Sequence, residues 1–184
     1  MLHENFKKIG EKLFQRGMNN SHSGNISIRE GDKIFISRTG SMLDELNADD
    51  IVRVGLEPDQ SIDQFASMEL LVHRAIYNRN SDVKSVVHAH VPYAVVLGAN
   101  HEEIIPYDDE GRYFLKSIPV LKVNNSIASE EVKEKIPSYI NASHGAVIVA
   151  KHGVFAWGKS LEEAYHYIMV TQSICKINYL LSKE

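Results

Sequence analysis

The segment that most constrains this chain is Val87-His88-Ala89-His90, which follows the apolar lead-in Ser85-Val86. Side chains of a β-strand alternate between its two faces, so a strand here projects both imidazoles to the same side. Two imidazole nitrogens and a third protein ligand can hold a catalytic zinc ion that keeps a fourth position open for substrate. The fold must then bring a third donor to this strand.

His152 is the candidate third ligand, because it lies at a strand junction and is followed by Gly153, which permits close backbone packing. His-X-His pairs also occur on strands that bind no metal, so a structural role stays open. His144 adjoins the start of a predicted strand and is an alternative ligand, whereas His101 and His166 lack a comparable setting.

Glu69 is predicted in the first turn of a helix that precedes the histidine strand. A carboxylate there is favoured by the helix dipole by about 0.3–1 kcal/mol, which is reason enough for a structural role. The alternative role is that of a general base, or of a fourth metal ligand that leaves when substrate arrives. His73 follows four residues later, on the same predicted helix face, and could orient Glu69. Spacing alone does not decide between these roles.

Hydrophobic periodicity predicts an irregular alternation of helices and strands. Helices are expected over about 4–16, from Ser67 as N-cap through Ile76, briefly after Pro92 and Ser129, and from Ser160 to near the C-terminus. Strands are expected at 25–29 and 33–37, which form a hairpin, and at 50–54, 84–90, 146–150 and 153–157, while 108–111 is expected to be a loop. This order favours a mixed sheet layered with helices, in the α/β class.

Bulk properties exclude several classes of protein. A length of 184 residues with 43% hydrophobic content predicts one domain, 1–184, with a sizeable core. The net charge of −4 argues against a nucleic-acid partner, and no apolar run reaches the roughly 20 residues that span a bilayer. The N-terminus does not resemble a secretory signal, and the single Cys175 is expected to be a buried residue of the last helix. These features favour a cytoplasmic protein.

Three short polar segments could bind phosphate through backbone N–H groups and hydroxyls: Gly24-Asn25, Thr39-Gly40 and Ser67. None matches a P-loop or a dinucleotide-binding fingerprint. Ordinary turns would explain each of them equally well.

Taken together and in this order, five motifs resemble the class II aldolase/adducin family, and within it the L-fuculose-1-phosphate aldolases. They are Gly24-Asn25-Ile26-Ser27, Arg38-Thr39-Gly40, Ser67-Met68-Glu69, Val87-His88-Ala89-His90, and the run from Lys151 to Gly158. The resemblance implies a three-layer α/β/α fold around a central, mixed, largely antiparallel sheet. It also implies a homotetramer with active sites at subunit interfaces.

The resemblance further implies the roles of individual residues. Zinc is the implied cofactor, although imidazole ligands also suit other divalent transition metals. The implied metal ligands are His88, His90 and His152, and the implied general base is Glu69. The implied phosphate-binding positions are Asn25, Thr39, Gly40 and Ser67. The implied reaction is reversible aldol cleavage of a small ketose phosphate to dihydroxyacetone phosphate and an aldehyde, with Glu69 removing the proton that gives the enediolate.

The chain departs from the family pattern at three places. Met68 stands where such aldolases carry a second serine, and a thioether cannot donate to a phosphate. Val123 follows the Ile118-Pro119 motif near the place where they carry a tyrosine proton donor, so Tyr113 or Tyr107 from a neighbouring subunit is the candidate donor. The sequence is also expected to lack the C-terminal tail that helps cover the site in longer relatives. A dehydratase, epimerase or decarboxylase of the same family therefore stays an alternative, whereas an adducin-like binding module is disfavoured because all the implied ligands are present.

Overall fold

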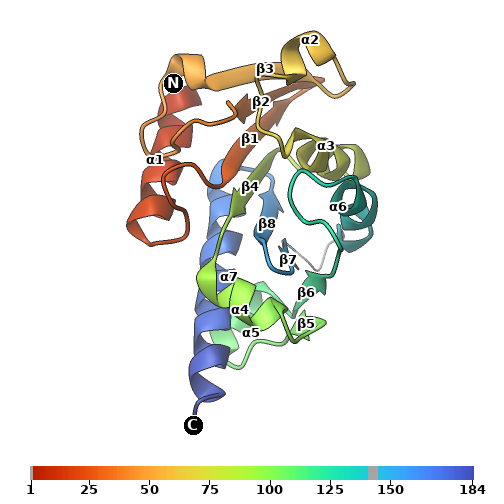
Figure 1. Ribbon diagram of the computed structural model, residues 1–184. Coiled ribbons are helices and arrows are strands. Elements are labelled where there is room, and N and C mark those ends of the chain that lie inside the picture. Colours follow the sequence, from red (N-terminus) through yellow and green to blue (C-terminus); the bar gives the residue numbers. More distant parts are fainter. Residues whose placement is uncertain (1, 141–144) are drawn as a thin grey trace.

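The computed structural model describes residues 2–140 and 145–184. In these residues eight strands form one sheet with the spatial order β3-β2-β1-β4-β8-β7-β6-β5 (Figure 1). The strands are β1 (Asn25–Glu30), β2 (Lys33–Ser37), β3 (Ile51–Gly55), β4 (Ser85–Ala89), β5 (Glu103–Ile104), β6 (Ile118–Leu121), β7 (Ala146–Val149) and β8 (Gly153–Gly158). Every neighbouring pair is antiparallel except β6 and β7, which are parallel. The expected mixed, largely antiparallel sheet is confirmed.

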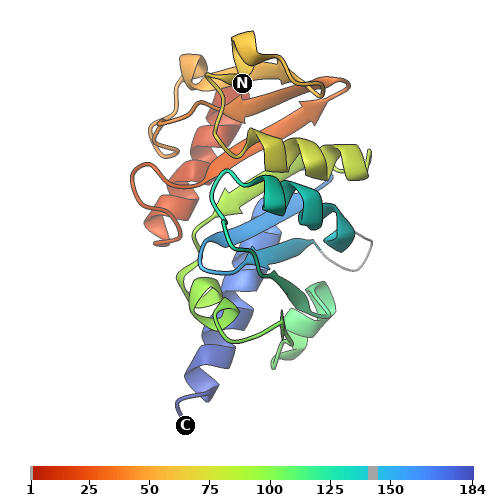
Figure 2. The same ribbon diagram turned by 45° about the vertical axis from the view of Figure 1, so that its right-hand side comes forward.

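Helices cover both faces of this sheet. The α-helices are α1 (Leu2–Gln15), α2 (Gln60–Asp63), α3 (Leu70–Arg79), α4 (Pro92–Gly98), α5 (Asp109–Phe114), α6 (Glu130–Lys135) and α7 (Leu161–Leu181). Two 3-10 turns, η1 (Ala48–Asp50) and η2 (Ile136–Tyr139), accompany them. Figure 2 shows α3 and α6 together on one side of the sheet, with α7 on the other.

Two separate hydrophobic cores result from this layering, because alternate strand residues pack on opposite faces. On β4, Val87 and Ala89 belong to the core that includes residues of α1, α4 and α7. Val86 belongs to the second core, with residues of α3 and α6. The three-layer α/β/α arrangement is therefore confirmed, and the sheet carries β4 at its centre. Cys175 is buried on α7 as expected.

Some local predictions were wrong. The acidic run 108–111 is not a loop: the Asp108 side chain accepts a hydrogen bond from the Gly111 N–H and caps α5, whose first turn carries two acidic residues. Ser67 is not the N-cap of α3, because the helix begins at Leu70 and Glu69 holds the cap position. The short elements α2, β5 and β6 were not predicted at all.

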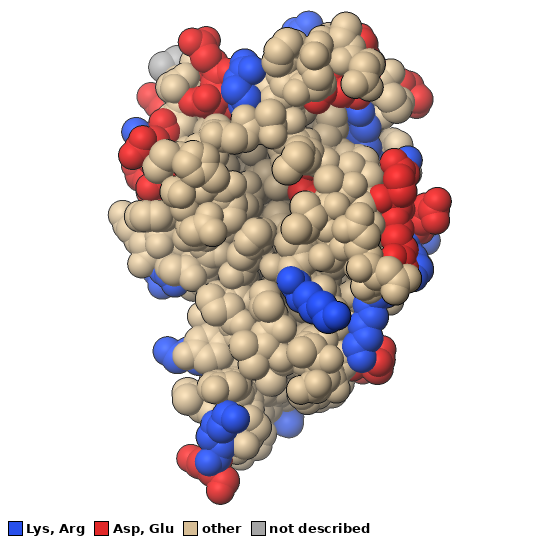
Figure 3. All heavy atoms as spheres, viewed as in Figure 1, with Lys and Arg blue, Asp and Glu red and all other residues tan. Residues whose placement is uncertain are grey.

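Over the described residues, no helix combines the length and the apolarity that crossing a bilayer requires. Lys and Arg side chains are interspersed with Asp and Glu on the face shown in Figure 3, and no continuous basic surface is seen there.

Candidate metal centre

Strand β4 places His88 at the centre of the sheet. His88 is paired with Asn25 on β1 and with Phe155 on β8. Its ring stacks on that of Phe155, with a centroid distance of 4.2 Å and an interplanar angle of 17°. His90 follows the end of the strand, and the Nε2 atoms of His88 and His90 are 3.2 Å apart. The two imidazoles thus lie on the same side of the strand, as the alternation predicts.

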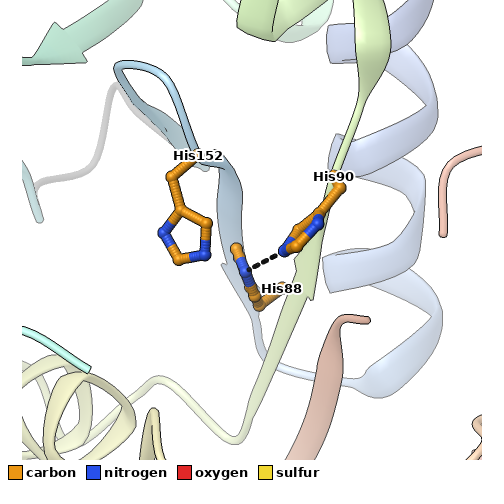
Figure 4. Close-up of side chains that lie close together, drawn as sticks. All are labelled: His88, His90 and His152. Carbon is orange, nitrogen blue, oxygen red and sulfur yellow. Dashed lines mark hydrogen bonds between the residues drawn. The ribbon is translucent and has the colours of Figure 1, made fainter. Parts of the chain in front are cut away.

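The turn between β7 and β8 supplies the third imidazole. His152 lies one residue before β8, after Lys151, whose φ of 65° is in the left-handed region. The ring centroid of His152 is 4.6 Å from that of His88 and 5.1 Å from that of His90. One ligand nitrogen from each of the three residues lies within 4.8 Å of the others (Figure 4). The alternative ligand His144 lies outside the described residues.

The hydrogen bonds of His88 suit a metal ligand. Its Nδ1 is 3.0 Å from the carbonyl oxygen of Val154 and must donate, because a carbonyl only accepts. The lone pair of Nε2 is then directed at the cluster. A backbone carbonyl that fixes the tautomer in this way is a common partner of metal-ligating histidines.

All three rings are neutral at neutral pH, as metal ligation requires. Burial and, to a smaller extent, the nearby His90 lower the pKa of His152 to about 4. Burial and the neighbouring His152 and His90 rings hold the pKa of His88 well below its ordinary value. Burial also lowers the pKa of His90. Three converging neutral imidazoles fit a divalent transition-metal ion.

Glu69 lies beside this cluster at the N-terminus of α3. Its Oε1 accepts a hydrogen bond of 3.0 Å from the Ala128 N–H and is 3.8 Å from the His152 Nε2. Its Oε2 is buried and has no hydrogen-bond partner among the described residues. Burial raises the pKa of the Glu69 carboxyl, and the bond from Ala128 opposes that rise. A buried carboxylate with one unpaired oxygen fits either a metal ion or a proton as its partner.

His73 does not orient Glu69. Its Nδ1 contacts Ser27 Oγ and its Nε2 contacts Asn25 Oδ1, so both ring nitrogens are directed at β1. The i,i+4 relation fails because Glu69, with φ −82° and ψ 4°, precedes the helix rather than belonging to it.

One cavity of about 300 Å³ joins the histidine cluster to the polar segments singled out in the sequence. Its lining includes His88, His90, His152, Glu69, Asn25, Thr39, Gly40 and Ser67. The loop after β2 meets the segment before α3 through an isolated bridge between Arg38 and Ala66, which brings Thr39 close to Ser67. The structure thus gathers all these candidates around one cavity.

The cavity also contains residues to which no role was assigned from the sequence. Arg38 lines it, and its position directly before Thr39-Gly40 was the available signal. Met68 lines it as well and is largely exposed. Tyr107 and Tyr113 do not line it; Tyr113 is 83% exposed on α5. Within one chain, the predicted proton donor is therefore not part of this cavity.

Gly153 is expected to be irreplaceable beside this centre. A Cβ atom there would lie 2.5 Å from the Ala89 carbonyl oxygen, 3.1 Å from His88 Cε1 and 3.2 Å from His90 Cδ2. Gly153→Ala is therefore expected to lower the free energy of unfolding by about 1–3 kcal/mol and to displace both rings. Denaturant unfolding and metal content after dialysis measure the two effects.

Gly55→Ala is the matched control, because a Cβ atom there would approach nothing closer than 3.5 Å. If Gly153→Ala had the stability and the metal content of the wild type, the close approach of β8 to the histidines would not be needed for folding or for metal binding.

Comparison with known proteins identifies the family of this chain. The family model of the Class II Aldolase and Adducin N-terminal domain matches residues 4–179. An L-fuculose phosphate aldolase of Methanococcus maripaludis (strain C7) is 31% identical over 178 residues, which are 97% of this chain and 96% of that protein. Human gamma-adducin is 30% identical over 162 residues, which are 83% of this chain but 22% of that protein.

The solved structures agree. The crystal structure of L-fuculose-1-phosphate aldolase from Thermus thermophilus superposes with a TM-score of 0.92 at 31% identity and covers 98% of this chain and 94% of that one. The motifs, the layered sheet and the shared cavity thus have one explanation: this chain belongs to the class II aldolase and adducin N-terminal domain family.

Proposed function

We propose that this chain is a metal-dependent class II aldolase, in which His88, His90 and His152 hold zinc. Its substrate would be a small ketose phosphate, cleaved reversibly to dihydroxyacetone phosphate and an aldehyde. The observation that carries the proposal is the single cavity lined by three neutral imidazoles, a buried carboxylate and four polar groups suited to phosphate. The similarity to L-fuculose phosphate aldolases over almost the whole chain supports the same class of substrate.

The chemistry of the chain's own residues follows from their surroundings. A bound divalent ion would supply Lewis-acid stabilisation of negative charge on the substrate oxygens. Glu69 would act as the base: Ala128 holds Oε1, and the buried Oε2 has no described partner, so Oε2 would take the proton from the carbon beside the carbonyl. Burial makes this carboxylate more basic, which favours the transfer. In the cleavage direction, the hydroxyl group that becomes the aldehyde loses its proton as the carbon–carbon bond breaks, and a protonated Glu69 carboxyl would give its proton to the remaining carbon.

Asn25, Thr39, Gly40 and Ser67 would bind the phosphate on the other side of the cavity. The backbone of Gly40 has a φ of 73°, which directs the turn around this end of the cavity. Arg38 adds a positive charge to the same loop. Met68 contributes no donor, so fewer groups would hold the phosphate than in relatives with a second serine.

A second candidate is another reaction that begins with the same proton abstraction, such as dehydration, epimerisation or decarboxylation. The observation that favours it is that no tyrosine is among the described residues that line the cavity. Aldol addition needs a proton donor for the aldehyde oxygen, and Tyr113 could supply it only from a neighbouring subunit. For the aldolase, we therefore propose a homotetramer in which Tyr113, exposed in the single chain, reaches the cavity of a neighbouring subunit. We also propose that the protein is cytoplasmic.

Deuterium exchange into dihydroxyacetone phosphate tests the proposed half-reaction. Zinc-loaded protein in D₂O is expected to exchange one proton at the carbon that carries the hydroxyl group, because Glu69 reversibly removes it without any aldehyde. Proton NMR follows the loss of that signal, and chelator-treated protein is the control. Exchange that is absent with zinc bound, or unaffected by the chelator, would contradict the proposed role of this centre.

A further inference from the structure

Behind the cavity wall lies a row of buried polar side chains, of which the proposed function uses only Asn25. Ser27, His73 and Tyr77 are fully buried, and Asn25 is 5% exposed. Tyr77 Oη is 2.7 Å from Ser27 Oγ, Ser27 Oγ is 2.6 Å from His73 Nδ1, and His73 Nε2 is 2.6 Å from Asn25 Oδ1. The row starts inside the layer between α3 and the sheet and ends at a residue that lines the cavity.

The row has one arrangement of hydrogens that satisfies every group. His73 is neutral, because burial lowers its pKa to about 3, so one ring nitrogen donates and the other accepts. If Nε2 donates to Asn25, then Nδ1 accepts from Ser27, and Ser27 accepts from Tyr77.

The opposite arrangement is disfavoured. It would make His73 Nδ1 donate to Ser27 and Ser27 donate to Tyr77, and the Tyr77 hydroxyl hydrogen would then lack an acceptor among the described residues. A fully buried donor without an acceptor costs about 1–3 kcal/mol. Tyr77 is therefore the group that sets the direction of the whole row.

This direction of the hydrogen bonds determines how the side-chain amide of Asn25 is oriented. Its Oδ1 is occupied by the His73 N–H, and its amide nitrogen has no hydrogen-bond partner among the described residues. The side chain therefore presents N–H donors to the cavity and cannot turn its carbonyl oxygen there without breaking the bond to His73. Donors attract the oxygens of an anion, whereas a carbonyl oxygen would repel them.

We propose that His73, held by Ser27 and Tyr77, is a positioning residue that fixes the Asn25 amide as a donor and thereby selects a phosphorylated substrate over its neutral counterpart. This inference rests on the proposed function, which places the phosphate beside Asn25. His73 is not one of the three residues of the histidine cluster, and its ring lies edge-on to Phe155, on which the His88 ring stacks.

The tautomer of His73 gives the direct test. Long-range ¹H–¹⁵N spectra of the zinc-loaded protein, with His73→Gln used to assign the signal, are expected to show a neutral ring protonated at Nε2. Protonation at Nδ1, or a charged ring, would overturn the proposed direction of the row whatever the enzyme's substrate.

Binding of inorganic phosphate gives the functional test. His73→Leu is expected to weaken phosphate binding to the zinc-loaded protein by about tenfold, which corresponds to one lost hydrogen bond to a charged group. His73→Gln is expected to restore most of it, because a glutamine amide can also donate to Asn25. With dihydroxyacetone phosphate, KM for the exchange reaction should rise in His73→Leu while kcat changes little. Exchange into neutral dihydroxyacetone should be unaffected.

Ser27→Ala is a second variant in case His73→Leu does not fold. It removes the donor to His73 Nδ1 and should weaken phosphate binding in the same direction. Equal phosphate affinity of wild type, folded His73→Leu and Ser27→Ala would overturn the positioning role while leaving the proposed function intact. If the zinc-loaded wild type binds no phosphate, the phosphate assignment of the proposed function fails, and the selection proposed here fails with it.

Discussion

Glu69→Gln is expected to lower the rate of proton exchange into dihydroxyacetone phosphate by about 10²–10⁴-fold, the usual contribution of a general base. Glutamine has nearly the shape of glutamate, so its side-chain oxygen can still accept the hydrogen bond from Ala128. It has no basic oxygen to replace Oε2, which is the atom left without a described partner in the cavity. The variant should therefore fold and retain zinc but lose turnover. The measurement is the exchange rate per bound zinc ion.

Glu131→Gln is the matched control. Glu131 also accepts a backbone hydrogen bond from the segment between β6 and α6, from Asn124 at 2.8 Å, but it does not line the cavity. If removing any carboxylate that binds this segment lowered the exchange rate, both variants would be slow. If Glu69 is the base, only Glu69→Gln is slow. Wild-type exchange by zinc-loaded Glu69→Gln would assign the base to another residue.

The histidine pair shows what the sequence can predict. Alternation along an extended strand places His88 and His90 on one side of β4, and this local rule holds whatever surrounds the strand. The two-residue spacing needs no knowledge of the rest of the fold. The same rule explains why Val87 and Ala89 enter the opposite core.

His73 shows where such local reasoning fails. The i,i+4 rule holds only inside a helix, and Glu69 precedes the first helical residue, Leu70. The ring is instead bound by Ser27 and Asn25, which are 46 and 48 residues away in the sequence. No periodicity within α3 carries information about these partners.

Contacts between segments that are distant in the sequence also determine which other residues come together at the cavity. The Arg38–Ala66 bridge brings Thr39 to Ser67, and the Ala128 N–H reaches Glu69 across 59 positions. Ala128 has a φ of 47°, a strained conformation for alanine that the sequence does not reveal. The family resemblance supplied the list of residues, but their common cavity is known only from the structure.

His88→Ala is expected to weaken zinc binding by about 100-fold or more, because it removes the ligand at the centre of the cluster, whereas loss of an outer-shell partner alone costs 10–100-fold. His88 is the best oriented of the three: Val154 fixes its tautomer and Phe155 fixes the plane of its ring. The other two imidazoles keep their places on either side, so residual weak binding is expected. Metal content after dialysis and zinc titration measure the change.

Thermal unfolding separates loss of metal from loss of fold. Zinc at about 100 times its dissociation constant should stabilise the wild type by about 2.7 kcal/mol, so adding a chelator should lower its Tm. His88→Ala should unfold cooperatively with a Tm that zinc and chelator change far less than that of the wild type, because a site weakened about 100-fold is only half occupied at this zinc concentration. His101→Ala is the matched control, since His101 lies outside the cluster and, among the described residues, bonds only to the Leu97 carbonyl on α4. It should keep the zinc response of the wild type. Full zinc occupancy in His88→Ala would exclude this residue as a ligand, and with it the cluster as the centre on which the proposed chemistry depends.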